Sequence, residues 1–505
     1  MSSRITIEKI EELAKRRGFF WQSSEIYGGF GGFYDYGHLG FLLKSKFENA
    51  WRKFFLSLND MFYEISPAVI MPEQVFQASG HLKSFQDPLC KCKKCGNIER
   101  ADHIIENALK ESFEGKTPKE LTELIRKHNI RCPKCGGEFG EVGELNMMFP
   151  LNIGADSETK AYLRPETAQG AYVNFKRMFE ILRKKLPLGL AIIGKAYRNE
   201  ISPRQLLIRT REFSQAELQI FFDPEKINEH PRWEDVADYQ LRLTTVKDRK
   251  KIIEMTCEDV NKKIGLPKFY VYYMAKIQQF YFNVMKIPKE LFRFKELSEE
   301  EKAFYNKYHW DIELNLASLG GFKEIAGIHY RTDHDLSGHQ NLSKEKMSVS
   351  IDGKKIIPHV IELSFGVDRN IYALLELAYS EERGQIILKF PRNLSPVDVA
   401  ILPLVKKDGM PEKAREVENI LKQNFVVFYD ESGSIGRRYA REDERGTAFA
   451  VTIDSQTMQD DTVTLRDRDT TVQIRVPVKE LTKTINKLMH YEIDFRKAGK
   501  VVYEP

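Results

Sequence analysis

The segment from Tyr197 to Glu217 of this 505-residue chain carries the side chains best suited to bind a charged ligand. It reads YRNEISPRQLLIRTREFSQAE, two strand-like runs on either side of a polar turn at Ser202, Pro203 and Arg204. Arginines and glutamates alternate along it: Arg198, Glu200, Arg204, Arg209, Arg211, Glu212 and Glu217. Because a guanidinium binds phosphate or carboxylate through paired hydrogen bonds, this hairpin could hold a nucleotide. An ion-paired surface facing solvent is the alternative that the segment alone leaves open.

The cysteines have the spacing of a metal site. Cys92 and Cys95 form one Cys-x-x-Cys-Gly pair, and Cys132 and Cys135 form a second. The glycine after each pair allows the tight turn of a metal knuckle, and four thiolates suit tetrahedral Zn²⁺. A disulfide framework is disfavoured, because the segment up to Gly18 reads as a capped helix and not as a signal peptide. We therefore expect a structural Zn²⁺ site, with Cys90 as the alternative to Cys92.

Composition sets limits on the class of protein. Hydrophobic residues make up 42% of the chain, which is ample for globular cores, and the length predicts two to four domains. No run approaches the roughly 18 apolar residues that a membrane helix needs. The formal net charge of +5 is mild, so any RNA contact must come from local patches. These features predict a cytoplasmic protein without membrane association.

The hairpin and five further blocks resemble class II glycyl-tRNA synthetases of the homodimeric type, which is archaeal, eukaryotic and Thermus-like. The hairpin matches motif 2 of that family. The other blocks are SSEIYGGFGGFYDYG (Ser23–Gly37), LRPETAQG (Leu163–Gly170), RTDHDLSGH (Arg331–His339), ELSFGVDR (Glu362–Arg369) and GSIGRRYARED (Gly433–Asp443). The resemblance implies an α+β fold, with an antiparallel sheet flanked by helices, a zinc-knuckle insertion, a helical insertion and a C-terminal α/β anticodon-binding domain.

On this resemblance the chain divides into six segments. The catalytic domain is expected in residues 1–80 with motif 1, 151–222 with motif 2 and 312–394 with motif 3; the zinc insertion in 81–150, a mainly helical insertion in 223–311 and the anticodon-binding domain in 395–505. Motif 1, the main homodimer contact of the family, would comprise an amphipathic helix over Phe41–Asn59 and a strand around Ile65–Ile70. An apolar stripe of this kind is more often ordinary core, so the predicted homodimer rests mainly on the resemblance.

The resemblance assigns motifs 2 and 3 to ATP and Mg²⁺. Arg198 would hold the α-phosphate, Arg209 the γ-phosphate, and Arg369 the triphosphate and one face of adenine. Phe213 would stack on the other face, and Glu200 would read the base. Glu324 and Glu362 would bind Mg²⁺ through oxygen ligands. The implied catalytic set is Arg198, Glu200, Arg209 and Arg369, and the ATP site adds Asn199, Thr210, Phe213, Glu324 and Ile325.

A glycine pocket must grip an ammonium and a carboxylate while leaving no room beyond the α-carbon. The resemblance implies that three glutamates meet the ammonium with help from Ser364, that Arg331 meets the carboxylate, and that Leu363 belongs to the same site. The glutamates are Glu166, Glu217 and Glu362. Leu363 stands where the family commonly has proline, and Ala326 stands where some members have a second glutamate. The sequence therefore departs from the family beside the substrate and metal positions.

The C-terminal segment alternates strands with helices and resembles the anticodon-binding domain of glycyl-, threonyl-, prolyl- and histidyl-tRNA synthetases. Arg437, Arg438 and Arg441 are candidate contacts to tRNA(Gly). Their acidic neighbours Glu442, Asp443 and Glu444 equally fit an ion-paired helix surface.

The predicted activity is ATP-dependent ligation of glycine to tRNA(Gly), through glycyl-adenylate with release of pyrophosphate. One alternative is a non-catalytic, synthetase-like nucleic-acid-binding protein, which the retained ATP arginines disfavour. Another is a class II synthetase for a different small amino acid, which the three glutamates disfavour.

Overall fold

A computed structural model of the chain describes residues 5–109, 113, 116–155, 159–201, 203, 205–303, 305–382 and 384–505. Ser202 and Arg204, predicted in the turn of the hairpin, lie outside these residues. Helix α1 (Ile7–Arg17) begins where predicted, because the Thr6 hydroxyl accepts a hydrogen bond from the Lys9 amide, and it ends at Gly18 in the left-handed region. None of the helices in the described residues has both the length and the apolar character needed to cross a membrane.

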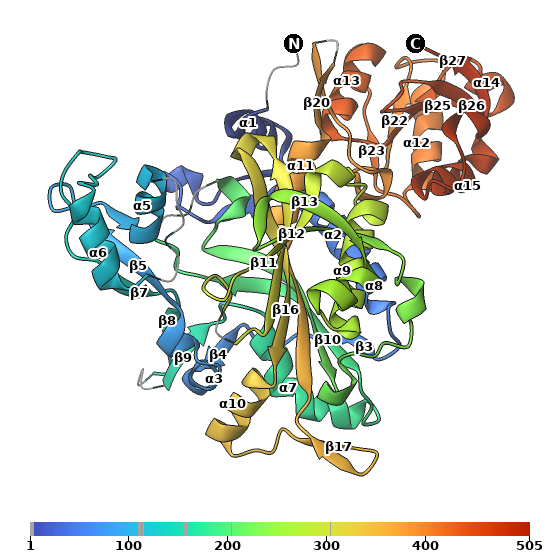
Figure 1. Cartoon of the computed structure of the whole chain (residues 1–505). Coiled ribbons are helices and arrows are strands. Elements are labelled where there is room, and N and C mark those ends of the chain that lie inside the picture. Colours follow the sequence, from blue (N-terminus) through green and yellow to red (C-terminus); the bar gives the residue numbers. More distant parts are fainter. Residues whose placement is uncertain are drawn as a thin grey trace.

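A nine-stranded, mainly antiparallel sheet forms the centre of the molecule (Figure 1). Its strands, in spatial order, are β13 (Asp248–Thr256), β12 (Gln240–Thr245), β14 (Phe292–Glu296), β15 (Tyr308–Leu316), β16 (Gly321–Thr332), β19 (His359–Gly366), β11 (Glu212–Phe222), β10 (Leu188–Tyr197) and β3 (Phe62–Glu64). The predicted hairpin is β10 and β11, which pair antiparallel over their whole length. The predicted α+β class with an antiparallel sheet is confirmed.

The arms of the hairpin are shorter than predicted near the turn. Regular pairing stops at Tyr197 and Glu212, and a 3-10 turn (Leu206–Ile208) lies in the connection. One further backbone bond joins the arms, from the Arg198 amide to the Arg211 carbonyl; beyond it, the Asn199 amide donates to the Met147 carbonyl, and the Arg211 amide donates to the Gly32 carbonyl. Contacts distant in sequence therefore replace the last rungs of the ladder.

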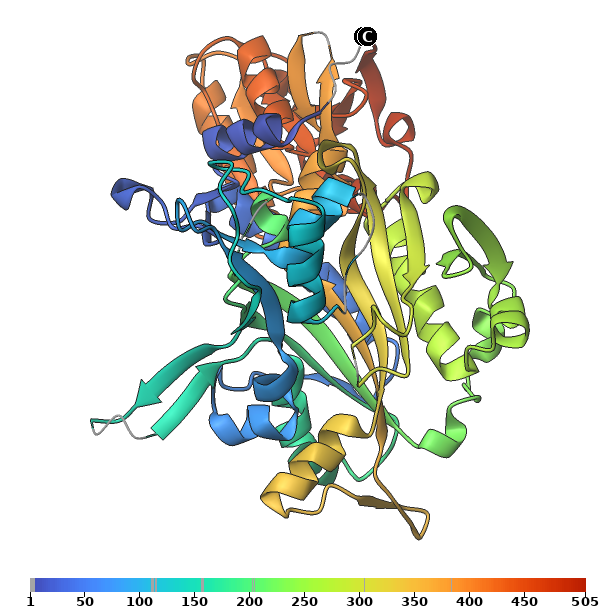
Figure 2. The same ribbon diagram turned by 60° about the vertical axis from the view of Figure 1, so that its left-hand side comes forward.

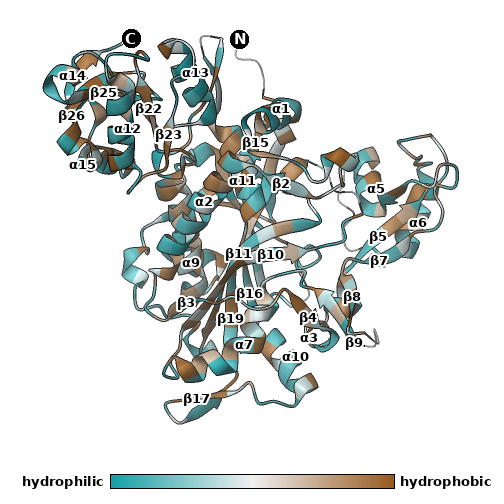
Figure 3. Cartoon of the chain, turned by 180° about the vertical axis from the view of Figure 1, so that it is seen from behind, coloured by the Kyte–Doolittle hydropathy of each residue, from teal (hydrophilic) through white to brown (hydrophobic). Residues whose placement is uncertain are grey.

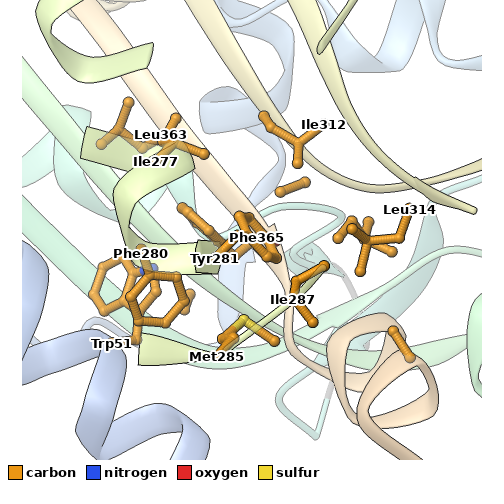
Figure 4. Packing of buried hydrophobic residues seen from close by; sticks show 14 of the residues in the cluster. Trp51, Ile277, Phe280, Tyr281, Met285, Ile287, Ile312, Leu314, Leu363 and Phe365 are labelled. Atoms are coloured by element: carbon orange, nitrogen blue, oxygen red, sulfur yellow. The ribbon is translucent and has the colours of Figure 1, made fainter. Parts of the chain in front are cut away.

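One face of the sheet packs into the main apolar core. The core is covered by α2 (His38–Leu56), α9 (Lys268–Gln279) and α11 (Val367–Ala378). In Figure 4, Trp51 of α2 and Phe280 lie beside Phe365 of β19. Since side chains alternate along a strand, Glu362 and Ser364 face the other side of β19, where the strands border a cavity.

The predicted motif 1 helix is present as α2, but the predicted strand around Ile65–Ile70 is not. Residues 65–69 have no regular structure, and the short strands β3 and β4 (Ile70–Pro72) lie on either side of them. Pro67 has no amide hydrogen for a ladder, and its ring packs against Gly170 of α7 (Ala168–Ile181). The apolar stripe of α2 is buried in the core of its own chain.

The segment 223–311, predicted to be mainly helical, is mixed. Helix α9, with the sequence KFYVYYMAKIQQ, is rich in aromatic residues and is buried in the core. The strands β12, β13 and β14, however, extend one edge of the main sheet. The prediction missed β13, the edge strand, because its sequence DRKKIIEMT is rich in charged residues. It missed β14, whose sequence FRFKE does alternate, because the run is only five residues long.

The cysteine-containing insertion is a small three-stranded sheet with two helices. The strands are β5 (Gln86–Lys91), β6 (Ile98–Arg100) and β7 (Gly143–Asn146), and the helices α5 (Ala101–Leu109) and α6 (Pro118–Lys127) lie between the two knuckles as predicted. In Figure 2 this insertion, blue to teal, lies in front of the main sheet.

The C-terminal segment has its own six-stranded sheet and apolar core. Its order is β23 (Val427–Tyr429), β22 (Val399–Pro403), β24 (Phe449–Ile453), β25 (Thr462–Asp467), β26 (Gln473–Pro477) and β27 (Lys500–Tyr503). Helices α12 (Met410–Leu421), α13 (Ile435–Arg445) and α15 (Val478–Met489) accompany it. Figure 3 shows brown, hydrophobic residues concentrated on the strands of the main sheet and more teal on outlying helices such as α6 and α12.

Candidate active site

The face of the main sheet opposite the apolar core borders a cavity of about 540 Å³. The predicted ATP residues that line it are Arg198, Glu200, Arg209, Thr210, Phe213, Glu324, Ile325 and Arg369. The predicted glycine residues that line it are Glu166, Glu217, Glu362 and Ser364. Residues from the hairpin, motif 3, strand β16 and the loop before α7 therefore meet in one site.

Two of the three phosphate arginines are paired with carboxylates in the cavity wall. Arg209 Nη2 lies 2.6 Å from Oε2 of Glu200, and Arg369 Nη1 lies 2.8 Å from Oε1 of Glu324. These ion pairs fix the direction of both guanidinium groups. A phosphate that enters the cavity would compete with the two carboxylates for them.

Arg198 is held differently. Its Nε donates to the Pro165 carbonyl at 3.1 Å, and its guanidinium carbon lies 5.3 Å from the ring centroid of Phe213. In the described residues no carboxylate forms an ion pair with Arg198, so its charge is available to an anion. The Phe213 ring beside it offers a stacking surface.

Glu217 is an acidic group without a cationic partner among the described residues. Its Oε2 accepts from the Thr167 hydroxyl at 2.6 Å, and its Oε1 accepts from the Ser364 hydroxyl at 2.6 Å and from the Gln215 amide at 2.9 Å. All three donors are neutral. Burial, together with the nearby carboxylates of Glu362 and Glu166, raises the pKa of Glu217 to about 8. The site is therefore prepared for a cation, such as a substrate ammonium.

Arg331, predicted to meet the substrate carboxylate, does not line the cavity. Its side chain is only 1% exposed, and its guanidinium pairs with Asp335 at 2.9 Å, Glu362 at 3.0 Å and Glu166 at 3.2 Å. Although burial opposes ionisation of Glu166, Arg331 and His81 hold the pKa of that carboxyl well below its usual range. Arg331 therefore fixes two of the predicted glycine-binding glutamates in their charged form.

Leu363 and Asn199 also lie outside the cavity lining. Leu363 is fully buried in the apolar core, because strand alternation turns it away from its neighbours Glu362 and Ser364. The backbone amide of Asn199 donates a hydrogen bond to the Met147 carbonyl at 2.8 Å. The sequence blocks locate these residues beside the site but do not show which side each one faces.

The predicted Mg²⁺ pair is separated along the sheet. Glu362 lies opposite His329 of β16. A bulge in β16 leaves Glu324 four ladder positions from His329, which is about 13 Å at the usual rise of a strand. The two glutamates therefore lie at different places along the cavity. Glu324 lies opposite Glu313 of β15 instead, and both line the cavity. Across the described residues, a cluster of cysteines is the one group with the spacing of a three- or four-ligand metal site.

That cluster comprises the predicted Cys92, Cys95, Cys132 and Cys135, with all four sulfurs within 4.8 Å of one another. The Sγ atoms of Cys92 and Cys135 are 3.5 Å apart, close to the roughly 3.8 Å that tetrahedral zinc requires with bonds near 2.3 Å. Backbone amides of Cys95 and Lys94 lower the pKa of Cys92 to about 6, whereas burial raises that of Cys90 to about 12. The donor set fits zinc, and Cys90 is not part of it.

The three arginine candidates for tRNA contact have different surroundings. Arg438 is buried, and its guanidinium donates to the carbonyls of Pro403, Leu404 and Asp430. Arg441 is paired with Asp430. Arg437 is exposed. Arg438 thus holds the fold together, and its burial excludes it as a surface contact to tRNA.

Two small hydrogen-bond networks at the cavity wall, centred on Asp368 and His329, were not predicted. Asp368, beside Arg369, accepts from the Ser214 amide at 2.5 Å and from the Tyr36 hydroxyl. His329 Nδ1 lies 2.5 Å from Glu362 Oε1, and its Nε2 lies 2.9 Å from Nε2 of His309. Tyr36 and Asp368 belong to blocks that the sequence singles out, but their pairing depends on the tertiary fold. His309 and His329 have no signal in their sequence spacing.

Comparison with known proteins agrees with this architecture. Residues 151–378 match the family described as tRNA synthetase class II core domain (G, H, P, S and T), and residues 398–488 match the anticodon binding domain. A crystal structure of prolyl-tRNA synthetase from Cryptosporidium parvum, complexed with L-proline and AMP, has a TM-score of 0.57 at 14% identity, over 95% of this chain and 75% of that one. This likeness shows a shared fold. The sheet, the cavity and the C-terminal domain define a class II aminoacyl-tRNA synthetase.

Curated relatives define the family more closely. The chain is 42% identical to the glycine–tRNA ligase of Pyrococcus furiosus, over 95% of this chain and 99% of that protein. It is 40% identical to the glycine–tRNA ligase of Methanococcus vannielii, over 93% of this chain and 97% of that protein. The chain belongs to the glycine–tRNA ligase family.

Proposed function

We propose that the cavity activates glycine with ATP, giving glycyl-adenylate and pyrophosphate, and that the glycyl group then passes to the 3′-terminal adenosine of tRNA(Gly). The observation that carries this proposal is Glu217, a buried carboxylate with three neutral donors and no cationic partner in the described residues. An amino-acid ammonium supplies the missing positive charge. Glu166 and Glu362 line the same cavity, but Arg331 already balances part of their charge.

The geometry of β11 supports a glycyl-adenylate that lies along this strand, with adenine at one end and the amino acid at the other. Phe213 and Glu217 face the same side of the strand, four residues apart, which is about 13 Å. Adenine stacked on Phe213 leaves its α-phosphate beside Arg198, with the amino-acid ammonium at Glu217. Arg198 is then the cation for both the α-phosphate and the glycine carboxylate, a role that the buried Arg331 cannot fill.

The chemistry needs no general base, because the glycine carboxylate is itself the nucleophile. It attacks the α-phosphorus, one P–O bond forms, and the bond to pyrophosphate breaks. Arg198, Arg209 and Arg369 stabilise charge on the phosphates, so catalysis is by position and electrostatics. Glu324 offers an oxygen ligand for Mg²⁺ carried by ATP. Cys92, Cys95, Cys132 and Cys135 would hold a structural Zn²⁺, which organises the insertion without taking part in the reaction.

We extend the proposal to the partners of the enzyme. A second copy of the chain is expected at the open edge of the main sheet, where β3 pairs on one side only, with β10, and Tyr63 is exposed. In the anticodon-binding domain, Arg437 is the remaining exposed candidate on α13. Sedimentation analysis that finds a monomer would reject the dimer.

The direct test of the overall reaction is charging of tRNA(Gly) transcript with radiolabelled glycine. The wild-type protein is expected to form acid-precipitable glycyl-tRNA in the presence of ATP and Mg²⁺. The Glu217→Gln variant should not form it at the same substrate concentrations. Equal charging by the two proteins would contradict the proposed site.

A further inference from the structure

The cysteine-containing insertion reaches the catalytic cavity through one arginine. Arg209 Nη1 lies 3.4 Å from Nε2 of His103 on α5, and its Nη2 lies 3.6 Å from Oδ2 of Asp87 on β5. On the hairpin side, the same guanidinium is paired with Glu200 at 2.6 Å. Two groups of the insertion therefore approach an arginine of motif 2.

The groups around Arg209 are fixed within the insertion. Asp87 is 4% exposed and lies 3.1 Å from Nη1 of Arg100, which also pairs with Asp102 at 2.8 Å. The Asp102 carboxylate accepts from the His103 amide at 2.9 Å. Burial, with the cations Arg100 and Arg209 nearby, lowers the pKa of His103 to about 4, so the neutral ring can accept a hydrogen bond from Arg209.

This network begins beside the cysteine cluster. Arg100 ends β6, which starts three residues after Cys95, and the Cys92 amide donates to the Asn97 carbonyl at 2.8 Å. β5 carries Asp87 and pairs with β6, so the knuckle and the acidic group belong to one short sheet. A metal on the four sulfurs would stabilise the knuckle turn that leads into β6, the strand that ends at Arg100.

We propose that the insertion serves as a positioning device for ATP: Asp87 and His103 aim the Arg209 guanidinium at the phosphate end of the cavity. Glu200 occupies Nε and Nη2, and His103 lies against Nη1. A guanidinium has five N–H groups, so donors remain for a phosphate once its orientation is fixed. The inference rests on the proposed role of Arg209 as a γ-phosphate contact. It gives the insertion a part in substrate binding beyond folding.

Asp87→Asn tests the device with little change in side-chain volume, and His103→Ala tests the second contact. Each variant should raise the KM for ATP in glycine-dependent ATP–pyrophosphate exchange, Asp87→Asn by roughly tenfold, as expected when Arg209 loses one partly buried ionic partner. The KM for glycine should stay within about twofold of the wild-type value, because glycine binds at the other end of β11. Both variants should keep their zinc and remain folded at the assay temperature, although Asp87→Asn also weakens the pair with Arg100 and should lower the melting temperature somewhat.

A matched control is Glu138→Gln. This exposed glutamate of the insertion pairs with Arg131 at 2.9 Å, and among the described residues it has no contact with Arg209. The control should leave the KM for ATP unchanged. Removal of zinc by a chelator should weaken ATP binding in the wild-type protein, measured as a Kd by titration calorimetry without turnover.

Arg209→Ala distinguishes the proposed role of Arg209 in ATP binding from the proposed positioning role of the insertion. An unchanged KM for ATP in Arg209→Ala would remove the proposed role of Arg209 itself. If Arg209→Ala raises the KM but folded, zinc-loaded Asp87→Asn and His103→Ala do not, the positioning role of the insertion is overturned while the ATP site stands. Equal rises in the KM values for ATP and glycine would also overturn it.

Discussion

Oε1 of Glu217 lies 2.6 Å from the Ser364 hydroxyl, and the two residues occupy directly paired positions on β11 and β19. The register of the main sheet therefore sets this contact, which joins motif 2 to the strand that leads into motif 3. The register also brings Glu217 near Glu362 without placing a cation between them. The cavity thus contains a carboxyl group that can ionise when a cationic ligand binds.

Removing that charge should abolish tight glycine binding. Glu217→Gln keeps the shape of the side chain but loses the ion pair with the ammonium, so the KM for glycine should rise roughly a hundredfold, about 3 kcal/mol. The KM for ATP should change little. Pyrophosphate exchange at varied glycine measures both constants. The control is Glu180→Gln, an exposed glutamate 3.9 Å from Lys176, which should behave like the wild type.

Glycine binding should depend on pH through Glu217. Its pKa of about 8 means that the ligand-free site is protonated at neutral pH, whereas the ammonium requires the ionised form. Glycine binding should release a proton, and the affinity should increase as pH rises towards 8. Calorimetry in buffers of different ionisation enthalpy measures the proton release. Proton release that persists in Glu217→Gln would assign the effect to another group.

The same shift affects stability. The pKa of Glu217 is raised in the folded chain from its ordinary 4.5 to about 8, so its protonated form favours the folded state at low pH and this contribution is lost as pH rises through about 8. Glu217→Gln cannot ionise. Its melting temperature relative to the wild type, without glycine, should therefore increase from pH 6 to pH 9. A difference that is constant over that range would contradict a raised pKa.

The sequence blocks identified which residues lie at or beside the site, but they did not show which way each side chain faces. Arg198, Glu217 and Arg369 lie in the cavity because the family pattern fixes which strands come together. Leu363 and Arg331 do not line the cavity, because block matching does not resolve the two faces of a strand or the burial of an arginine among Glu166, Asp335 and Glu362. The strands β12 and β14 were missed although apolar and polar residues alternate in QLRLTT and FRFKE, because runs this short stand beside the longer aromatic helix α9.

Arg331 and Arg198 should respond in opposite ways to substitution. Arg331→Met leaves buried carboxylates without their cation and should destabilise the fold by about 3–5 kcal/mol, which denaturant unfolding would measure. Arg198→Ala should leave stability nearly unchanged but remove about 3 kcal/mol of transition-state stabilisation, seen as a lower kcat/KM in exchange. A stable Arg331→Met protein that fails only in glycine binding would restore the direct substrate role for Arg331.

Substitution of single cysteines should show which of them bind the metal. Cys92→Ser should lose stoichiometric zinc and lower the melting temperature, because the cluster needs all four thiolates. Cys90→Ser should keep the metal, since the Cys90 thiol lies 3.6 Å from the Glu99 carbonyl and outside the cluster. Elemental analysis of purified protein measures both. Full zinc content in Cys92→Ser would show that the ligand set is wrong.

The measurement that tests the central claim most directly is ATP–pyrophosphate exchange with each proteinogenic amino acid in turn. The proposed glycine site at Glu217 and Ser364 predicts exchange with glycine and background rates with alanine and serine. Failure of glycine to support exchange, or stronger exchange with another amino acid, would contradict the proposed function.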